Sequence, residues 1–374
     1  MSSIAFYISG HGFGHASRQV EIVNRLAARR PDLRILIRTA AARWLLDRTV
    51  MPAFDLDARP VDTGVAQIDS LHLDEAKTIA DAREFYATLE ARADEEARQL
   101  VEHDVAFVVS DAPPLACAAA ARAGIPSVVV SNFTWDWIYE GYDTGEGYEG
   151  NERSRVIQTI RNAYARADAA WRLPMHGGFA GFKAIVDVPF VARHATQARE
   201  ETRRRLGLPS NRRLVLPTFG GYGVNGLDVN ALDLGDRWHV ARVADQAIYD
   251  AGLRYEDLIR AVDVVITKPG YGTLSECIAN DTAVVYTSRG RFAEYDVLVR
   301  EMPKYLRCAY LDNESLLAGR WQAALDAALA APEPPQRPRT DGAVIIADMI
   351  CARVERRVAT LDGSPRRRSI DAIA

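Results

Sequence analysis

Residues 7–26, "YISGHGFGHASRQVEIVNRL", join a short apolar run to a helical pattern through a loop of three glycines and two histidines. Glycines let a backbone approach a ligand closely and adopt conformations that other residues rarely take. The helix that follows begins with free N–H groups and partial positive charge, which favour an anion. His11 and His15 add groups that can transfer a proton near neutral pH. The stretch therefore predicts a ligand site at a strand-to-helix turn.

Short runs rich in β-branched residues recur along the chain, and helical patterns separate them. Continuous apolar strands that alternate with helices indicate parallel sheets covered on both faces. A charged segment at 193–213 divides these runs, and we expect each half to begin with a strand, a glycine-rich loop and a helix; the second loop is "FGGYGVNG" at 219–226. The predicted fold is α/β, with two doubly wound, Rossmann-like domains at residues 1–195 and 205–330 that face each other across a cleft.

Helical patterns and a linker complete this organisation. A Pro-rich linker at 331–339 precedes an amphipathic helix at about 341–358, which we expect to pack back on the first domain. The other expected helices lie at 16–29, 75–102, 114–123, 151–167 and 273–280.

Composition limits the possible partners. The 374 residues carry a net charge of −4 without a basic stripe before the last dozen residues, which argues against a nucleic-acid partner. The four cysteines are scattered, as expected in a reducing compartment. The chain begins at once with a strand and has no apolar run of membrane-spanning length, so we expect a cytoplasmic protein without a transmembrane segment.

The histidine loop does not match two better-known ligand motifs. Its glycines run G-x-G-x-G, and His15 stands where the dinucleotide fingerprint has its third glycine. Arg38 follows the second strand in place of an acidic residue, which leaves only an NADP interpretation of that motif. A zinc site at His11 and His15 lacks further ligands at useful spacing. The alternative to a functional role is that the histidines only form local hydrogen bonds in the turn.

A second turn lies in "VDVVITKPGYGTLSECIAND" at 262–281, where a strand ends at Lys268 and a helix carries Glu276. In a functional interpretation, the turn and helix N-terminus hold phosphate, and the carboxylate accepts sugar hydroxyls. The competing interpretation is structural, because Thr273 as N-cap and Glu276 three residues later also form a capping box. Both interpretations remain open from these residues alone.

Two further stretches follow strands and can border the same crevice. In "TSRGRFAEYDVLVREM" at 287–302, Glu294 can accept hydroxyls of a second sugar ring, whereas Arg289 and Arg291 are expected to be solvated. The aromatic stretch at 131–150 offers Trp135 and Trp137 as a platform for a sugar ring or a flat acceptor, or else as packing beneath a loop, and Asp111 ends the strand "VAFVVSD" beside it.

Taken in order, "GHGFGHASR", "FGGYG" and "KPGYGTLSE…GRFAEY" resemble inverting glycosyltransferases of the GT-B, MurG-like group over about residues 4–310. The start "GHGFGHA" is very similar to that of the glycosyltransferase-like amino-terminal segment of plant L-arabinokinases. The chain departs from arabinokinases because it has no sugar-kinase domain or kinase ATP motif, so phosphorylation is not expected.

The resemblance implies transfer of a sugar from a nucleoside diphosphate, UDP for preference, to an acceptor hydroxyl or amine without a metal or other cofactor. Retaining enzymes of this fold often carry E-x7-E, which Glu276, Glu294 and Glu301 do not form here, so inversion is expected. His15, or else His11, would be the general base. The acceptor would meet Asp111, Trp135 and Trp137, and the donor would meet Gly12, Gly14, Gly220, Gly221, Tyr222, Gly223, Lys268, Gly270, Tyr271, Gly272, Thr273, Glu276, Glu294 and Tyr295.

Two alternatives use the same architecture. One is a nucleotide-sugar 2-epimerase, although the chain has "GHGFGH" and "KPGYG" in place of the motifs typical of those enzymes. The other is a non-catalytic nucleotide-sugar-binding module that regulates a partner.

Overall fold

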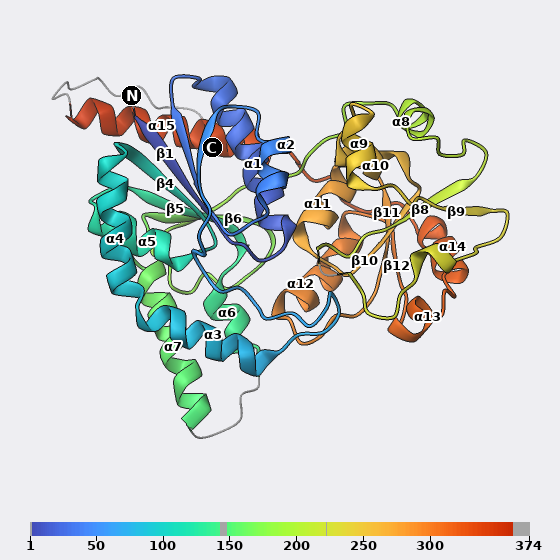
Figure 1. Cartoon of the computed structure of the whole chain (residues 1–374), viewed down its shortest axis with the longest axis horizontal. Helices are drawn as coiled ribbons and strands as arrows, with labels where there is room; N and C mark the ends of the chain where they lie inside the picture. The colour runs from blue at the N-terminus through green and yellow to red at the C-terminus, as the bar shows by residue number, and fades with distance from the viewer. Residues whose placement is uncertain (1, 143–147, 222, 362–374) are drawn as a thin grey trace.

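Two parallel β-sheets organise the computed structural model, which describes residues 2–142, 148–221 and 223–361 (Figure 1). In the described residues the first sheet has the strand order β3-β2-β1-β4-β5-β6-β7 and the second β12-β11-β10-β8-β9. All paired strands run parallel. The strands are β1 (Ser3–Ile8), β2 (Arg34–Arg38), β3 (Phe54–Asp57), β4 (Val105–Asp111), β5 (Ser127–Phe133), β6 (Ala169–Gly177), β7 (Ile185–Asp187), β8 (Arg213–Pro217), β9 (Trp238–Val240), β10 (Val264–Thr267), β11 (Ala283–Tyr286) and β12 (Cys308–Tyr310).

Helices connect these strands and cover both sheets. The central strands β1, β4 and β5 are buried along their whole length, as their apolar sequences predict. The helices are α1 (Phe13–Arg29), α2 (Arg43–Thr49), α3 (Glu75–Ala87), α4 (Leu89–Glu102), α5 (Pro114–Arg122), α6 (Trp135–Glu140), α7 (Tyr148–Tyr164), α8 (Arg199–Arg205), α9 (Asp245–Asp250), α10 (Tyr255–Ala261), α11 (Tyr271–Asn280), α12 (Ala293–Glu301), α13 (Asn313–Leu317), α14 (Gln322–Ala330) and α15 (Gly342–Leu361), with 3₁₀ turns η1 (Val229–Ala231) and η2 (Met302–Lys304).

Two local predictions were wrong. The helix expected at 75–102 is broken at Thr88 into α3 and α4. The second half does not repeat the strand, glycine loop and helix of the first half, because η1 and then β9 follow the loop after β8. Gly220, Gly223 and Gly226 in this loop have positive φ, a backbone conformation that does not continue into a helix.

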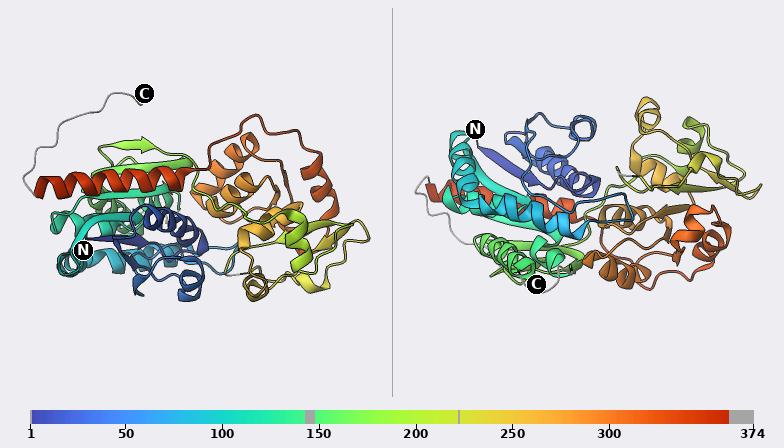
Figure 2. Two further views of the ribbon diagram at one scale, coloured as in Figure 1. Left: turned by 90° about the horizontal axis from the view of Figure 1, so that it is seen from above. Right: turned by 60° about the horizontal axis from the view of Figure 1, so that its bottom comes forward.

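The last helix lies across the first half of the chain, where α15 packs against α1 and β4 (Figure 2). Its buried side chains recur at helical spacing and form one apolar stripe: Ala343, Ile346, Ala347, Ile350 and Val354. An ion pair between Arg29 and Asp348 joins the exposed side of the same contact.

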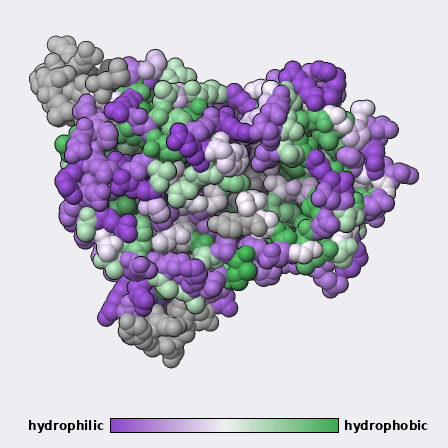
Figure 3. All heavy atoms as spheres, in the orientation of Figure 1, coloured by the Kyte–Doolittle hydropathy of each residue, from purple (hydrophilic) through white to green (hydrophobic). Residues whose placement is uncertain are grey.

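The two halves also meet directly. Helix α1 contacts α11, and α12 contacts β6 and α6. A first-half loop crosses to the second half, where Ser70 donates its N–H to the Gly223 carbonyl at 3.0 Å and its hydroxyl to the Phe219 carbonyl at 2.5 Å. On the face shown in Figure 3, the outer parts of both halves are mostly hydrophilic, and residues of intermediate hydropathy gather where they meet.

Candidate active site

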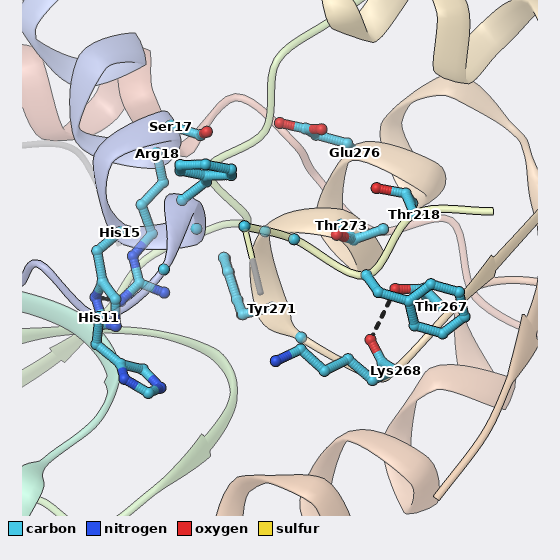
Figure 4. Close-up of a pocket in the computed structure, with 18 of the residues that line it drawn as sticks. His11, His15, Ser17, Arg18, Thr218, Thr267, Lys268, Tyr271, Thr273 and Glu276 are labelled. Carbon is cyan, nitrogen blue, oxygen red and sulfur yellow. Dashed lines mark hydrogen bonds between the residues drawn. The ribbon is translucent and has the colours of Figure 1, made fainter. Parts of the chain in front are cut away.

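A cavity lies between the two halves, and the predicted turns form opposite walls of it (Figure 4). The amino-terminal end of α1 contributes the first wall, and the start of α11 with the loop after β8 contributes the second. The cavity is lined by thirteen of the site residues predicted from sequence: His11, Gly12, Gly14, His15, Gly220, Gly221, Lys268, Gly270, Tyr271, Gly272, Thr273, Glu276 and Glu294. Tyr222 lies outside the described residues.

Glycines bring the two turns into contact. Gly12 precedes α1 with φ of 72° and ψ of −175°, a combination almost restricted to glycine. A Cβ atom on Gly272 would lie 3.1 Å from the Cα atom of Gly14, so the starts of α1 and α11 touch through their backbones. Both helix N-termini therefore reach the cavity from different halves of the molecule.

His15 belongs to a buried polar network. Its Nδ1 lies 2.8 Å from Oδ1 of Asp111, and the guanidinium of Arg18 donates to both oxygens of the same carboxylate at 2.5 Å. Burial raises the pKa of Asp111, but Arg18 and His15 beside it more than offset this effect and hold the pKa below its usual range. Asp111 is thus an anion that holds the His15 ring, with Nε2 left as the ring nitrogen that forms no hydrogen bond to the described residues.

The same network crosses to the second half. Arg18 donates to Oδ1 of Asn132 at 2.7 Å, and Asn132 donates from Nδ2 to Oε1 of Glu294 at 2.8 Å. The Arg18 guanidinium also lies 5.1 Å from the centre of the Tyr271 ring. The position of His15 is therefore coupled to α11 and α12.

His11 has a different environment. Its Nδ1 accepts the Val65 N–H at 3.3 Å, and its Nε2 lies 3.1 Å from the side-chain nitrogen of Gln67. Burial lowers the pKa of His11 well below its ordinary value, and Arg289, His15 and Lys268 lower it further. A neutral ring with both nitrogens in contact with the protein is a poorer candidate than His15 for a general base.

The second turn leads into α11, whose N-terminus is not capped by a side chain. Gly270 is the N-cap of α11, no side chain caps the helix, and Thr273 is its third residue, so the capping-box interpretation of Thr273 and Glu276 was wrong. Glu276 instead accepts a hydrogen bond from Nε of Arg193 at 2.6 Å. Burial raises the pKa of Glu276 to about 7, and Arg193 opposes that rise.

Two expected acceptor contacts were wrong, because Trp135 and Trp137 do not line the cavity. Trp135 is fully buried, donates from Nε1 to Asp62 at 2.8 Å and stacks on Tyr139. Trp137 packs so closely on the β6 end that a Cβ atom on Gly177 would overlap its ring. Core packing, the alternative considered from sequence, explains both indoles.

Other predicted contacts also lie outside the cavity wall. Asp111 is fully buried behind His15, so it positions that ring and does not touch an acceptor. Tyr295 is half-buried, and the pKa of its hydroxyl is raised to about 12 by burial and by Tyr286 and Tyr310 nearby. Gly223 is engaged through its carbonyl with Ser70.

Sequence reasoning missed several cavity residues, of which Arg289 is the clearest error. It was expected to be solvated, but only 8% of it is exposed and its guanidinium stacks 4.1 Å from the centre of the Phe292 ring. Arg18 could have been found, because a position three residues after His15 lies on the same helix face. The other missed wall residues with polar side chains include Ser17, Gln67, Arg193, Thr218 and Thr267.

The described residues lack a metal-binding cluster and a membrane-spanning helix. They hold no group of three or more His, Cys, Asp or Glu side chains arranged to hold a metal ion. No helix in the described part of the chain combines the length and the hydrophobicity that crossing a membrane requires.

Comparisons with known proteins identify relatives and the fold. No family model matches the chain. The chain is 32% identical over 338 residues to L-arabinokinase from Arabidopsis thaliana, a match that covers 87% of this chain and 32% of that protein. It is 30% identical over 225 residues to an uncharacterized glycosyltransferase from Methanopyrus kandleri, covering 54% of this chain and 60% of the relative. The chain thus spans about a third and about three fifths of the lengths of these curated relatives.

The whole architecture is similar to a solved UDP-glucosyltransferase from Polygonum tinctorium that can glucosylate indoxyl. The TM-score is 0.57 at 11% identity, over 97% of this chain and 98% of the other, and so low an identity shows the fold alone. The predicted GT-B architecture and the likeness to arabinokinase are confirmed. The chain therefore has the GT-B glycosyltransferase fold and is a relative of L-arabinokinase and of the Methanopyrus glycosyltransferase over the matched lengths.

Proposed function

We propose that the protein is an inverting glycosyltransferase that moves a sugar from a UDP-linked donor to an acceptor hydroxyl or amine. The observation that supports this proposal most strongly is the placement of the His15–Asp111 pair at one wall of a cavity whose other wall is the start of α11. A candidate base and a helix N-terminus that can bind an anion then border the same cavity. The names of the Methanopyrus relative and of the Polygonum structure support sugar transfer in general.

Backbone groups would hold the donor diphosphate. The free N–H groups at the start of α11 and the loop at Gly220 and Gly221 border the cavity and can stabilise the negative charge that develops on the leaving UDP. Transfer by this route would not require a metal ion. Glu276 lies one helical turn further along α11 and would accept the ribose hydroxyls.

His15 would perform the proton transfer. As the acceptor oxygen or nitrogen forms its bond to the sugar C1, the bond from C1 to the diphosphate oxygen breaks, and Nε2 of His15 takes the acceptor proton. Asp111 would accept the hydrogen bond from Nδ1 and stabilise the imidazolium that forms. Attack opposite the leaving group in one step inverts the configuration at C1.

The proposal is tested by binding and by product analysis. Calorimetry with UDP, GDP, dTDP and their glucose conjugates should give the tightest binding for the uridine compounds. Transfer or slow hydrolysis of a UDP-sugar, followed by NMR, should release a product of inverted anomeric configuration. Formation of a C2 epimer without acceptor would support the epimerase instead, and tight binding with no turnover under any condition would support a regulatory module.

A further inference from the structure

Two cationic side chains occupy the part of the cavity nearest His11. Lys268 follows β10 and Arg289 follows β11, and these strands are adjacent and parallel. Because parallel neighbours end at the same sheet edge, the two side chains reach the cavity from one side. In Figure 4 the amino group of Lys268 points away from the Thr218 and Thr273 side and toward His11.

Within the described residues, neither cation has a carboxylate within 4.0 Å. Lys268 donates from Nζ to the neutral side-chain oxygen of Gln67 at 3.3 Å. Arg289 is more than nine-tenths buried, and its Nε atom has no hydrogen-bond partner among the residues that the structure describes. Glu294 of the same wall attracts both cations electrostatically, but its Oε1 atom accepts a hydrogen bond from Asn132 at 2.8 Å.

The other arginines of the wall are paired, which makes Lys268 and Arg289 stand out. Arg18 forms an ion pair with Asp111 at 2.5 Å, and Arg193 forms one with Glu276 at 2.6 Å. A buried cation without a counter-ion is unfavourable, and the usual solution in a binding site is an anion supplied by the ligand. Burial, and to a lesser extent the nearby Arg289, lower the pKa of Lys268 to about 7, and a bound carboxylate beside its amino group would favour the charged form.

The location of these cations separates them from the diphosphate contacts. In Figure 4, Thr218 and Thr273 lie between Lys268 and Glu276, the residue that pairs with Arg193. Lys268 and Arg289 lie near enough to His11 to lower its pKa, and the amino group of Lys268 points toward His11 in Figure 4. In the proposed function this side receives the transferred sugar and the acceptor, beyond the phosphates.

We propose that Arg289 and Lys268 form a carboxylate subsite, so that the sugar unit held beside His15 is acidic, a uronic acid carried either by the nucleotide donor or by the acceptor. This inference rests on the proposed function and adds a substrate class to it. The planar guanidinium of Arg289 can donate two parallel hydrogen bonds to a carboxylate, and Lys268 can add a third. A neutral hexose offers the two cations no carboxylate.

The donor arm of the test compares UDP-glucuronate and UDP-galacturonate with UDP-glucose, UDP-galactose and UDP by calorimetry. The wild-type protein should bind at least one UDP-uronate about tenfold more tightly than its neutral counterpart, or more, as expected for a charge-assisted pair. Arg289→Gln should remove this preference and leave the affinity for UDP within about twofold. Arg291→Gln is the matched control, because Arg291 is exposed on the same loop, lies outside the cavity wall and should keep the preference.

The acceptor arm uses UDP-glucose as donor with glucuronate, galacturonate, glucose and galactose as acceptors. If the acid belongs to the acceptor, the uronates should be used at lower KM, and Arg289→Gln should raise that KM with little change in kcat. Lys268→Gln provides a second variant, and thermal melting of each variant confirms that it is folded.

Three results would overturn the subsite. The first is the absence of any carboxylate preference in both arms. The second is an Arg289→Gln variant that loses affinity for UDP as much as for UDP-uronates, which would assign the cations to the diphosphate. The third, no binding of UDP or of any UDP-sugar by the wild-type protein, would contradict the proposed function itself and the subsite with it.

Discussion

The turns at residues 10–15 and 268–272 both carry a strand into a helix, and their backbones touch at Gly14 and Gly272. The first turn leads into a helix whose His15 and Arg18 the fold buries with Asp111 in an ion-paired network. The second is followed by an uncapped helix start and preceded by Lys268, which has only a neutral partner. Under the proposed function, the two similar backbone turns would serve different tasks because different side chains flank them: proton transfer in the first turn and anion binding in the second.

The strongest test of this division is His15→Ala. If the first turn supplies only the proton transfer, turnover of a UDP-sugar should fall about 100- to 10,000-fold. The affinity for UDP, held by the second turn, should stay within about twofold. Steady-state kinetics and calorimetry on the same variant measure both quantities. A large loss of UDP affinity would show that the two turns do not divide the work.

The glycines of the first turn should differ in their tolerance of alanine because of backbone conformation. Gly12 has φ of 72° with open space around it, so Gly12→Ala should cost about 1–3 kcal/mol of unfolding free energy from strain alone. Gly14 has ordinary contacts at 3.8 Å and no positive φ, so Gly14→Ala should be tolerated. Denaturant unfolding of the two variants provides the comparison, and equal losses would contradict the conformational explanation.

In the second turn, we expect steric contact rather than backbone conformation to determine how well each glycine tolerates alanine. A methyl group on Gly272 would press on Gly14 at 3.1 Å, so Gly272→Ala should cost about 1–3 kcal/mol by overpacking and should also weaken UDP-sugar binding as the turns separate. Gly270 has no atom within 4 Å of an added Cβ and an extended φ of −152°, so Gly270→Ala should leave the free energy of unfolding nearly unchanged. Unfolding midpoints that do not separate these two variants would remove the role assigned to the contact.

The fold and both turns were predictable because their signals are local. Buried β-branched runs predict parallel strands, and glycines directly after a strand mark the positions where the backbone must turn sharply. The hydrogen-bond partners of the site residues were much harder to predict. Asp111 was placed near the crevice from its position at a strand end, but its separation of 96 residues from His15 hid the hydrogen bond that defines its role.

Two arginines in the loop after β11 show most directly what could not be predicted from the sequence. Arg289 and Arg291 stand two residues apart in one short loop, with nothing in the sequence to distinguish them. The structure buries Arg289 against Phe292 and leaves Arg291 exposed beside Glu75. Which of two neighbouring side chains enters a cavity depends on how the loop packs between the halves, and that packing has no local sequence signal. The same holds for Trp135, whose aromatic ring is equally suited to a ligand platform and to the core in which it lies.

The smallest effect that we expect is a pH dependence of UDP-glucose affinity that arises from Glu276, on the helix that follows the second turn. The pKa of Glu276 is about 7, against an ordinary value of 4.5, so the group ionises as the pH rises through neutrality. An ionised carboxylate accepts ribose hydroxyls better than a protonated one, so affinity for UDP-glucose, whose diphosphate does not titrate in this range, should rise up to about tenfold between about pH 6 and about pH 8. Glu276→Gln should remove this rise while leaving the opposing titration of Lys268 in place.

The free energy of unfolding should change with pH in the opposite direction to the affinity for UDP-glucose. A carboxyl group whose pKa is higher in the folded than in the unfolded protein stabilises the fold fully below the unfolded value. For Glu276 that contribution is present below about pH 4.5 and is lost as the pH rises through about 7. Unfolding of the wild-type protein and of Glu276→Gln across this range should therefore show a smaller loss of stability in the variant. Parallel curves for the two proteins would mean that Arg193 keeps Glu276 ionised throughout.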